Sequence, residues 1–217
     1  MATTAELIWG AILQGLPVSL ALTTTALFFG AVAGVPICAA QLSKSKSLRI
    51  SAAFVVIIVR SIPPIVWLFI LFFGFGSLSI NFSPFSAAAL GLALITAANF
   101  SEIYRGALKA IPAGQWEACR TLGLSPVSTF FDVLVPQLTR IILPSVGAYA
   151  IGLLKDTAIA STIGVQDLAE GAHRISQQTF KGLEVFAVFG LVYFGVSLTI
   201  GIITRAVDNY LRRRISR

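Results

Sequence analysis

The sequence has few of the residues that build soluble, metal-binding or disulfide-bonded proteins. Only 12% of its 217 residues are charged, whereas a soluble domain carries about 25%. One histidine and two cysteines are too few for a metal cage or a framework of disulfides. Cys38 lies in an apolar run and Cys119 in a polar one, so we expect both to be free thiols. We assign no metal site and no catalytic residue.

A secretory signal is also lacking. The segment 1–10 contains Glu6 but no lysine or arginine, so it has no basic region of the kind that begins a signal peptide. We therefore expect the first long apolar stretch to remain in the mature protein.

What the sequence has in abundance is apolar residues, at 56%. A helix needs about 20 mostly apolar residues to cross a bilayer, and five stretches meet that need. The sequence therefore predicts an all-α membrane protein with five transmembrane helices in one domain, 1–217. The residues 7–13 could form a short separate helix along the membrane interface. The five predicted spans are 16–42, 50–73, 85–103, 141–165 and 183–204.

The basic residues predict how the chain is oriented. The net charge of +7 does not indicate nucleic-acid binding, because lysine and arginine lie between apolar runs and not on one soluble domain with interleaved aromatics. Most of them follow the first, third and fifth spans, and few follow the second and fourth. Cytoplasmic connections are enriched in lysine and arginine. We therefore expect the N-terminus outside the cell and the C-terminus in the cytoplasm.

The longest cytoplasmic connection, 105–140, begins with a predicted short helix. Pro112 suits the first position of a helix, and no helix breaker lies between Gly114 and Leu122. Gly123 follows where a helix often ends in the left-handed conformation.

A second helix is predicted directly after the first. Ser125 suits its N-cap and Pro126 its first position, and we expect Pro136 to end it. Its apolar residues fall at helical spacing on one stripe. They are Val127, Phe130, Phe131 and Leu134. Two such helices at an angle suit a docking element for a soluble partner.

This connection resembles the EAA loop of ABC-importer permeases, whose signature is Glu-Ala-Ala, three residues, Gly, nine residues and Ile-x-Leu-Pro. The spacing matches throughout, with Cys in place of the second Ala and Val in place of Ile and Leu. The matching residues are Glu117, Ala118, Cys119, Gly123, Val133, Val135 and Pro136. The resemblance to the polar amino-acid permeases then extends over nearly the whole chain. It includes the segments 102–107, 111–117, 138–144 and 153–157.

The resemblance implies a coupling role for the loop. The first loop helix would dock in a groove of a separate ATPase subunit, which would bind ATP and Mg²⁺, so this chain would need no cofactor. The implied coupling residues are Trp116, Glu117, Ala118, Gly123 and Pro136. The alternative for Glu117 is a solvated surface pair with Arg120, at i, i+3. The chain has no phosphate-binding Gly-rich loop ending in Lys-Ser/Thr, so we expect it not to hydrolyse ATP.

The other implied partners are a second copy or a sister permease and an extracytoplasmic substrate-binding protein, in a bacterial inner membrane. The implied function is an importer permease for a polar amino acid or a close analogue. A secondary transporter and a membrane-embedded enzyme using Lys155, Asp156 or His173 are the alternatives. His173 lies in a polar connection, where a solvated histidine is expected.

Two polar residues inside spans are candidates for the substrate path. Arg60 begins the segment Arg-Ser-Ile-Pro, where the family has Arg-Gly-Thr-Pro. Trp67 stands where a Gln is common in the family. Because polar groups are lost at both places, we assign neither Ile62 nor Trp67 to substrate binding. An arginine inside a span usually faces a cavity or a partner, although Arg60 could instead snorkel to the interface. Asn99 could touch substrate or hydrogen-bond a neighbouring helix.

Lys155 and Asp156 lie roughly 21 Å into the fourth span. That depth suits a gate in the outer half of the membrane or a break in the helix. Adjacent residues do not face each other on a helix, so we expect no ion pair between them. Asp156 is the only acidic residue deep in a span, which mildly disfavours a strongly cationic substrate.

Overall fold

The computed structural model describes residues 3–75 and 81–215, and within these ranges it consists of helices and short connections. Positions 76–80 of the connection between the second and third predicted spans lie outside the described residues. The α-helices are α1 (Thr4–Gln41), α2 (Lys46–Ser61), α3 (Pro64–Phe69), α4 (Pro84–Ala110), α5 (Ala113–Thr121), α6 (Pro126–Ser128), α7 (Val135–Asp156), α8 (Leu168–Thr179) and α9 (Gly182–Ile215).

Four helical segments are long and apolar enough to cross a membrane, and a bent pair of helices makes up to five. The four are Thr4–Gln41, Pro84–Ala110, Pro126–Ile163 and Gly182–Leu211. The fifth joins Lys46–Ser61 to Pro64–Gly74 across a bend of 98°. The predicted all-helical membrane fold is therefore confirmed.

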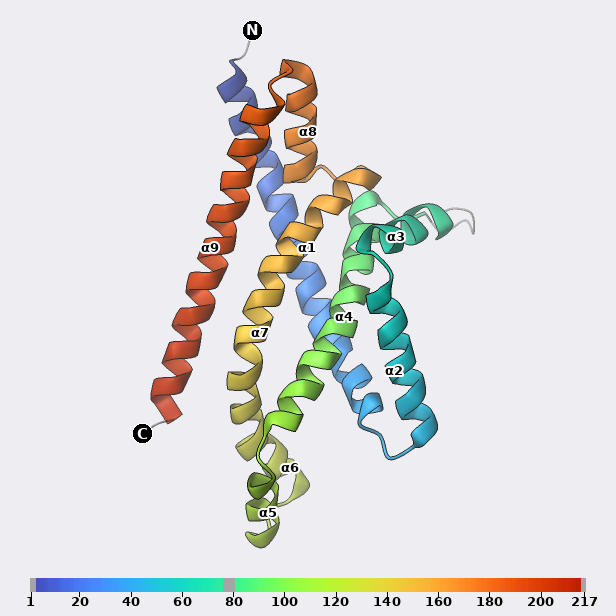
Figure 1. Cartoon of the computed structure of the whole chain (residues 1–217), viewed down its shortest axis with the longest axis vertical. Helices are drawn as coiled ribbons and strands as arrows, with labels where there is room; N and C mark the ends of the chain where they lie inside the picture. Colours follow the sequence, from blue (N-terminus) through green and yellow to red (C-terminus); the bar gives the residue numbers. More distant parts are fainter. Residues whose placement is uncertain (1–2, 76–80, 216–217) are drawn as a thin grey trace.

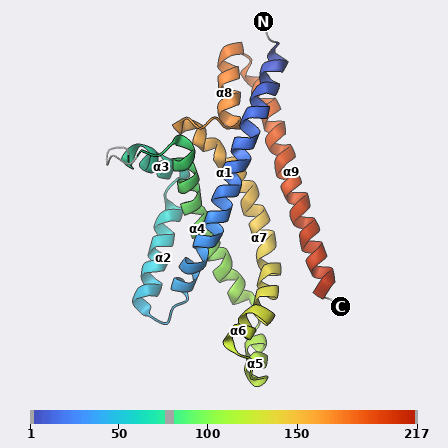
Figure 2. The ribbon, with the colours of Figure 1, turned by 180° about the vertical axis from the view of Figure 1, so that it is seen from behind.

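The basic connections gather at one end of the molecule. Figure 1 places the α1–α2 connection, the helices α5 and α6 and the C-terminal end of α9 at the bottom, and α8 and the N-terminus at the top. The view from behind shows the same arrangement (Figure 2). This distribution matches the predicted topology, in which the three basic connections share one side of the membrane.

The separate interfacial helix considered for 7–13 is wrong, because α1 runs without a break from Thr4 to Gln41. A capping box begins it, with the Thr3 side chain accepting from the Glu6 amide and the Glu6 carboxylate accepting from the Thr3 amide. Pro17 lies inside the helix without ending it.

The core forms where α1 crosses α4. A Cβ atom on Gly30 would lie 2.4 Å from the Thr96 side chain, and one on Gly34 would lie 2.9 Å from Cβ of Phe100. No side chain fits at such distances, so both glycines let the two backbones approach closely. Thr96 and Phe100 are buried beneath them.

Pro136 does not end a helix, which corrects the prediction. The chain passes from α6 through a π-helical segment, Thr129–Leu134, directly into α7, where Pro136 is near the first position. A wider turn shifts the hydrogen-bond pattern, so that the Val135 amide donates to Phe130. The Gln137 side chain donates to the Val133 carbonyl at 3.0 Å. The proline is therefore accommodated at the start of a helix.

At the opposite end, α8 is held tightly against α1. A Cβ atom on Gly15 would lie 2.7 Å from the Asp167 carbonyl oxygen. The Leu168 amide donates to the Ser19 hydroxyl at 3.2 Å, and the Asp167 carboxylate caps α8 by accepting from the Glu170 amide at 2.9 Å. This close packing fixes the first turn of α8.

Candidate functional site

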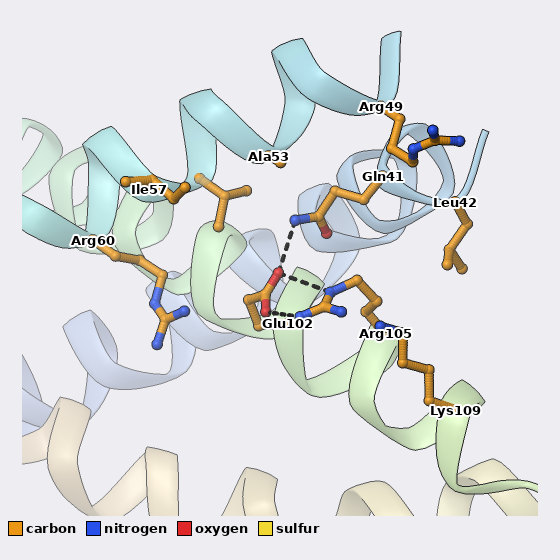
Figure 3. Close-up of a pocket in the computed structure, with 10 residues that line it drawn as sticks. Gln41, Leu42, Arg49, Ala53, Ile57, Arg60, Glu102, Arg105 and Lys109 are labelled. Atoms are coloured by element: carbon orange, nitrogen blue, oxygen red, sulfur yellow. Dashed lines mark hydrogen bonds and ion pairs between the residues drawn. The ribbon is translucent and has the colours of Figure 1, made fainter. Parts of the chain in front are cut away.

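A pocket of about 480 Å³ lies between the end of α1, one face of α2 and the second half of α4. Its lining residues are Gln41, Leu42, Arg49, Ala53, Val56, Ile57, Arg60, Glu102, Arg105 and Lys109. Figure 3 shows that their side chains come from all three helices and surround one space. Four of these side chains are cationic and one is acidic, so the pocket has an excess of positive charge.

The single acid of the pocket is neutralised by a hydrogen-bonded network. The Gln41 amide donates to Glu102 Oε1 at 2.8 Å, and the guanidinium of Arg105 donates to both oxygens of the same carboxylate (Figure 3). A bidentate pair of this kind is geometrically specific. The network connects α1 to α4. Arg49, Arg60 and Lys109 take part in none of the ion pairs found among the described residues.

Arg60 lies at the deep end of the pocket because α2 stops there. Pro63 and Pro64 have no amide hydrogen, so the chain leaves the helix and starts α3 at a bend of 98°. The Trp67 indole donates to the carbonyl oxygen of Val59 at 3.1 Å, which satisfies one group that the break would leave without a helical partner. Trp67 therefore has a structural contact across the helix break.

Of the four predicted path residues, Arg60 lines this pocket, and Asn99, Lys155 and Asp156 are not among its lining residues. The phenol of Tyr149 on α7 is within electrostatic range of Arg60 and Asp156 and interacts with the Asn99 side chain. Its hydroxyl donates to Thr96 at 3.1 Å. Tyr149 thus connects α7 to α4 near three of the predicted residues.

Lys155 is separated from this group. Its side chain is exposed, whereas Asp156 is half-buried. No ion pair joins the two in the described part of the chain, in agreement with the expectation from helix geometry. Asn99 also donates to the Ile95 carbonyl at 2.9 Å, within its own helix.

The predicted coupling residues lie at the basic end of the molecule. α5 ends with Gly123 at φ +66°, which confirms the expected left-handed turn. Trp116 packs against a buried cluster that includes Ile111 and Leu134, whereas Glu117 and Ala118 are exposed.

The apolar stripe of the loop is largely uncovered. Leu134 is 2% exposed, but Val127, Phe130 and Phe131 are 67%, 43% and 62% exposed. Leu122, which precedes the stripe, is 74% exposed. Large apolar side chains gathered at such exposure mark an interaction surface. Pro136 is exposed as well and lies at the start of α7.

The remaining sequence candidates lie apart from the pocket. His173 is exposed on α8 and contacts Gln177 at 2.9 Å, as expected for a solvated histidine. Cys38 and Cys119 are free and buried. Sequence reasoning did not select Gln41 or Tyr149, and it used Glu102 and Arg105 only as parts of a family motif.

Comparison with known proteins identifies the family. A family model described as binding-protein-dependent transport system inner membrane component matches residues 11–217. The chain belongs to this family. It is therefore a multi-pass membrane permease subunit of a bacterial ABC transporter, and its described helices supply the spans that such a subunit needs.

Individual relatives agree with this assignment. The permease is 34% identical over 185 residues to the probable amino-acid ABC transporter permease protein YckA of Bacillus subtilis, covering 85% of this chain and 82% of that one. It is 31% identical over 210 residues to the L-cystine transport system permease protein TcyB of the same organism, covering 94% and 90%.

Solved structures show the same fold. A crystal structure of an amino acid ABC transporter with histidines superposes with a TM-score of 0.87 at 28% identity, covering 97% of this chain and 99% of that one. An inward-facing structure of the MetNI methionine ABC transporter gives 0.82 at 21% identity, with the same coverage.

Proposed function

We propose that this permease subunit forms part of the translocation pathway for a polar amino acid and couples that pathway to a separate ATPase. The observation that carries the proposal is the pocket between α1, α2 and α4, which extends from Arg49 and Lys109 to Arg60 at the helix break. Relatives of this chain are named as amino-acid permeases, and an arginine deep in a span usually faces such a path.

The two ends of the pathway have different roles. Arg60 would meet the substrate at the deep end of the pocket. Asn99 and Asp156 would join it there, because all three residues interact with Tyr149 electrostatically or through a hydrogen bond. An arginine binds a carboxylate through two parallel hydrogen bonds, so Arg60 suits the substrate's α-carboxylate. Asp156 suits its ammonium group. The positive lining nearer the loop disfavours a strongly cationic substrate.

The loop formed by α5 and α6 would bind the ATPase subunit in the cytoplasm. Its exposed Leu122, Val127 and Phe131 offer the apolar surface that a partner groove requires. ATP and Mg²⁺ would be bound by that partner, and a substrate-binding protein would deliver the amino acid at the opposite end, beside α8. A secondary transporter would have no use for this docking surface.

Reconstitution tests the proposal. The permease is co-expressed with an ATPase subunit of its family, alone or with a sister permease. Uptake of each labelled L-amino acid into liposomes is then measured with ATP and binding protein. We expect the ATPase to co-purify and one or a few polar amino acids to accumulate only with ATP. Uptake driven by an ion gradient without ATP would contradict the proposal, as would the absence of any ATPase in the purified complex.

A further inference from the structure

One side chain in the first turn of α7 is bonded to the helix α5. The Nε2 atom of Gln137 donates to the Val133 carbonyl oxygen at 3.0 Å and to Oε1 of Gln115, on α5, at 3.1 Å. A side-chain amide carries two hydrogens on its nitrogen, so these two bonds use both. Because a carbonyl oxygen can only accept, the bond to Val133 determines which end of the Gln137 amide faces α5.

These bonds lie at a weak point of the backbone. The π-helical segment Thr129–Leu134 passes directly into α7, and Pro136 lies at that junction without an amide hydrogen. The junction therefore has one backbone hydrogen bond fewer than an uninterrupted helix. Gln137 is the next residue along the chain, and its side chain bonds back across the same turn to Val133.

The other contact of α5 with this junction is apolar. Trp116 packs against the buried cluster that contains Leu134 and Leu138. Apolar contact has no preferred direction, so it would leave α5 free to turn about its own axis. A hydrogen bond requires alignment of its groups. The bond from Gln137 to Gln115 therefore fixes which way α5 presents its exposed residues, Glu117 among them.

The start of α7 is also bonded to a membrane-spanning helix. One turn after Gln137, the guanidinium of Arg140 donates to the carbonyl oxygen of Leu211, near the C-terminal end of α9, at 3.1 Å. Figure 1 shows α5 and α6 below the ends of α4 and α7. The first turns of α7 are thus bonded to α5 through Gln137 and to α9 through Arg140.

We propose that Gln137 is a positioning residue for energy coupling, because it fixes the orientation of α5 relative to α7. The assignment rests on the proposed function, in which α5 binds the ATPase subunit. A movement imposed on α5 is then passed to the start of α7 and, through Arg140, to α9. Without the bond to Gln115, α5 can turn against Trp116 while the spans stay in place.

The test uses substitutions at both ends of the bond, in the complete importer complex. Gln137→Met keeps the length of the side chain and removes both donors, whereas Gln115→Met removes only the acceptor on α5. Gln115→Glu keeps an acceptor and is the matched conservative variant. Gln178→Met, at an exposed position of α8, controls for the loss of a surface amide.

The measurement is the number of amino-acid molecules taken up per ATP hydrolysed, in liposomes with loaded binding protein. The labelled probe is whichever member of a panel, the twenty L-amino acids and L-cystine, the wild-type complex accumulates most. We expect this ratio to fall about fivefold in Gln137→Met and in Gln115→Met, the change in population that corresponds to one hydrogen bond. Gln115→Glu and Gln178→Met should stay within about twofold of wild type. A merely structural defect would lower uptake and hydrolysis together and leave the ratio unchanged.

The double variant Gln137→Met, Gln115→Met shows whether the two residues act through one bond. We expect its ratio to fall about fivefold as well, because residues that share one interaction are not additive. A fall close to the product of the two single effects would mean independent roles and would overturn the assignment.

The remaining outcomes separate this assignment from the proposed function. An unchanged ratio in Gln115→Met overturns the role of the bond, even if Gln137→Met fails to assemble, while wild-type uptake still supports the permease. Equal losses in Gln115→Met and Gln115→Glu also overturn it, because the acceptor would then be irrelevant. A wild-type complex without ATP-dependent uptake of any panel member overturns the proposed function, and this assignment with it.

Discussion

The indole Nε1 of Trp67 donates to the carbonyl oxygen of Val59 at 3.1 Å, across the break between α2 and α3. Pro63 and Pro64 cannot supply backbone donors there. One side chain thus closes the bend that places Arg60 at the deep end of the pocket.

Replacing Trp67 by Phe should weaken the bend. The substitution keeps an aromatic ring but leaves the Val59 carbonyl without this donor, a cost of about 1 kcal/mol. We expect a lower thermal midpoint of the purified complex and slower uptake. Trp9→Phe is the matched control, because Trp9 is 63% exposed. Equal midpoints for the two variants would show that the indole bond does not stabilise the bend.

The coupling loop depends on Gly123. Its φ of +66° is strained for any residue with a Cβ, although open space surrounds it, so Gly123→Val should cost about 1–2 kcal/mol and redirect α5. Gly106→Val is the control, since Gly106 has the same open surroundings without a positive φ. We expect both variants to insert, and only Gly123→Val to lose the ATPase or its stimulation by loaded binding protein. Equal stimulated hydrolysis in both would argue against a coupling role.

Arg60 and Asp156 should matter for transport more than for assembly. Arg60→Gln and Asp156→Asn keep side-chain size but remove the two charges that act on Tyr149. We expect uptake to fall by about tenfold or more, with normal amounts of complex in the membrane. Lys46→Gln, outside the pocket lining, should leave uptake unchanged. Normal uptake by both charge variants would place the path elsewhere.

Asp167 should make stability depend on pH. Burial raises the pKa of its carboxyl from 3.8 to about 6. The folded state therefore binds the proton more tightly than the unfolded state. The resulting stabilisation is fully present below pH 3.8 and is lost as the pH rises through about 6. For such a shift it amounts to at most about 3 kcal/mol.

Asp167→Asn keeps an N-cap side chain and removes the titration. We expect the thermal midpoint of the wild-type protein to decrease as the pH is raised from 4 to 7. The midpoint of the variant should stay nearly constant over the same range. Parallel pH profiles for the two proteins would show that Asp167 does not titrate in this range.

Cysteine labelling tests the orientation in the membrane. Gln178 on α8 and Thr121 on α5 are exposed at opposite ends. Gln178→Cys should react with an impermeant thiol reagent in intact cells, and Thr121→Cys only after lysis. The native Cys38 and Cys119 are buried and provide the background. Reaction of Thr121→Cys in intact cells would reverse the topology.

Local features were predictable from the sequence, whereas contacts between helices were not. Gly123 and the Ser125–Pro126 helix start depend on neighbouring residues alone, and the structure confirms them. Pro136 was predicted wrongly because a π-helical segment leads directly into α7, and the proline stands near the first position of that helix.

The site itself could be predicted only in part. Arg60, Asn99 and Asp156 are conspicuous as polar groups in apolar runs. Arg60 lines the pocket, and all three interact with Tyr149. Tyr149 and Gln41 carry no such signal. Their roles arise from Thr96 and Glu102 on α4, which glycines at positions 30 and 34 bring close to α1.

The central claim is that the pocket between α1, α2 and α4 is the transport path and opens toward the coupling loop. Ala53→Cys places a thiol in its lining, and Lys46→Cys places a control thiol outside it. The deciding measurement is the rate of labelling by an impermeant thiol reagent in inside-out vesicles, with and without ATP and vanadate. The account predicts that Ala53→Cys reacts readily without nucleotide and about tenfold more slowly in the vanadate-trapped state. Modified Ala53→Cys should also lose uptake. The labelling rate of Lys46→Cys should be the same in both states, and its uptake should survive modification. Equal labelling of Ala53→Cys in both states, with uptake intact after modification, would contradict it.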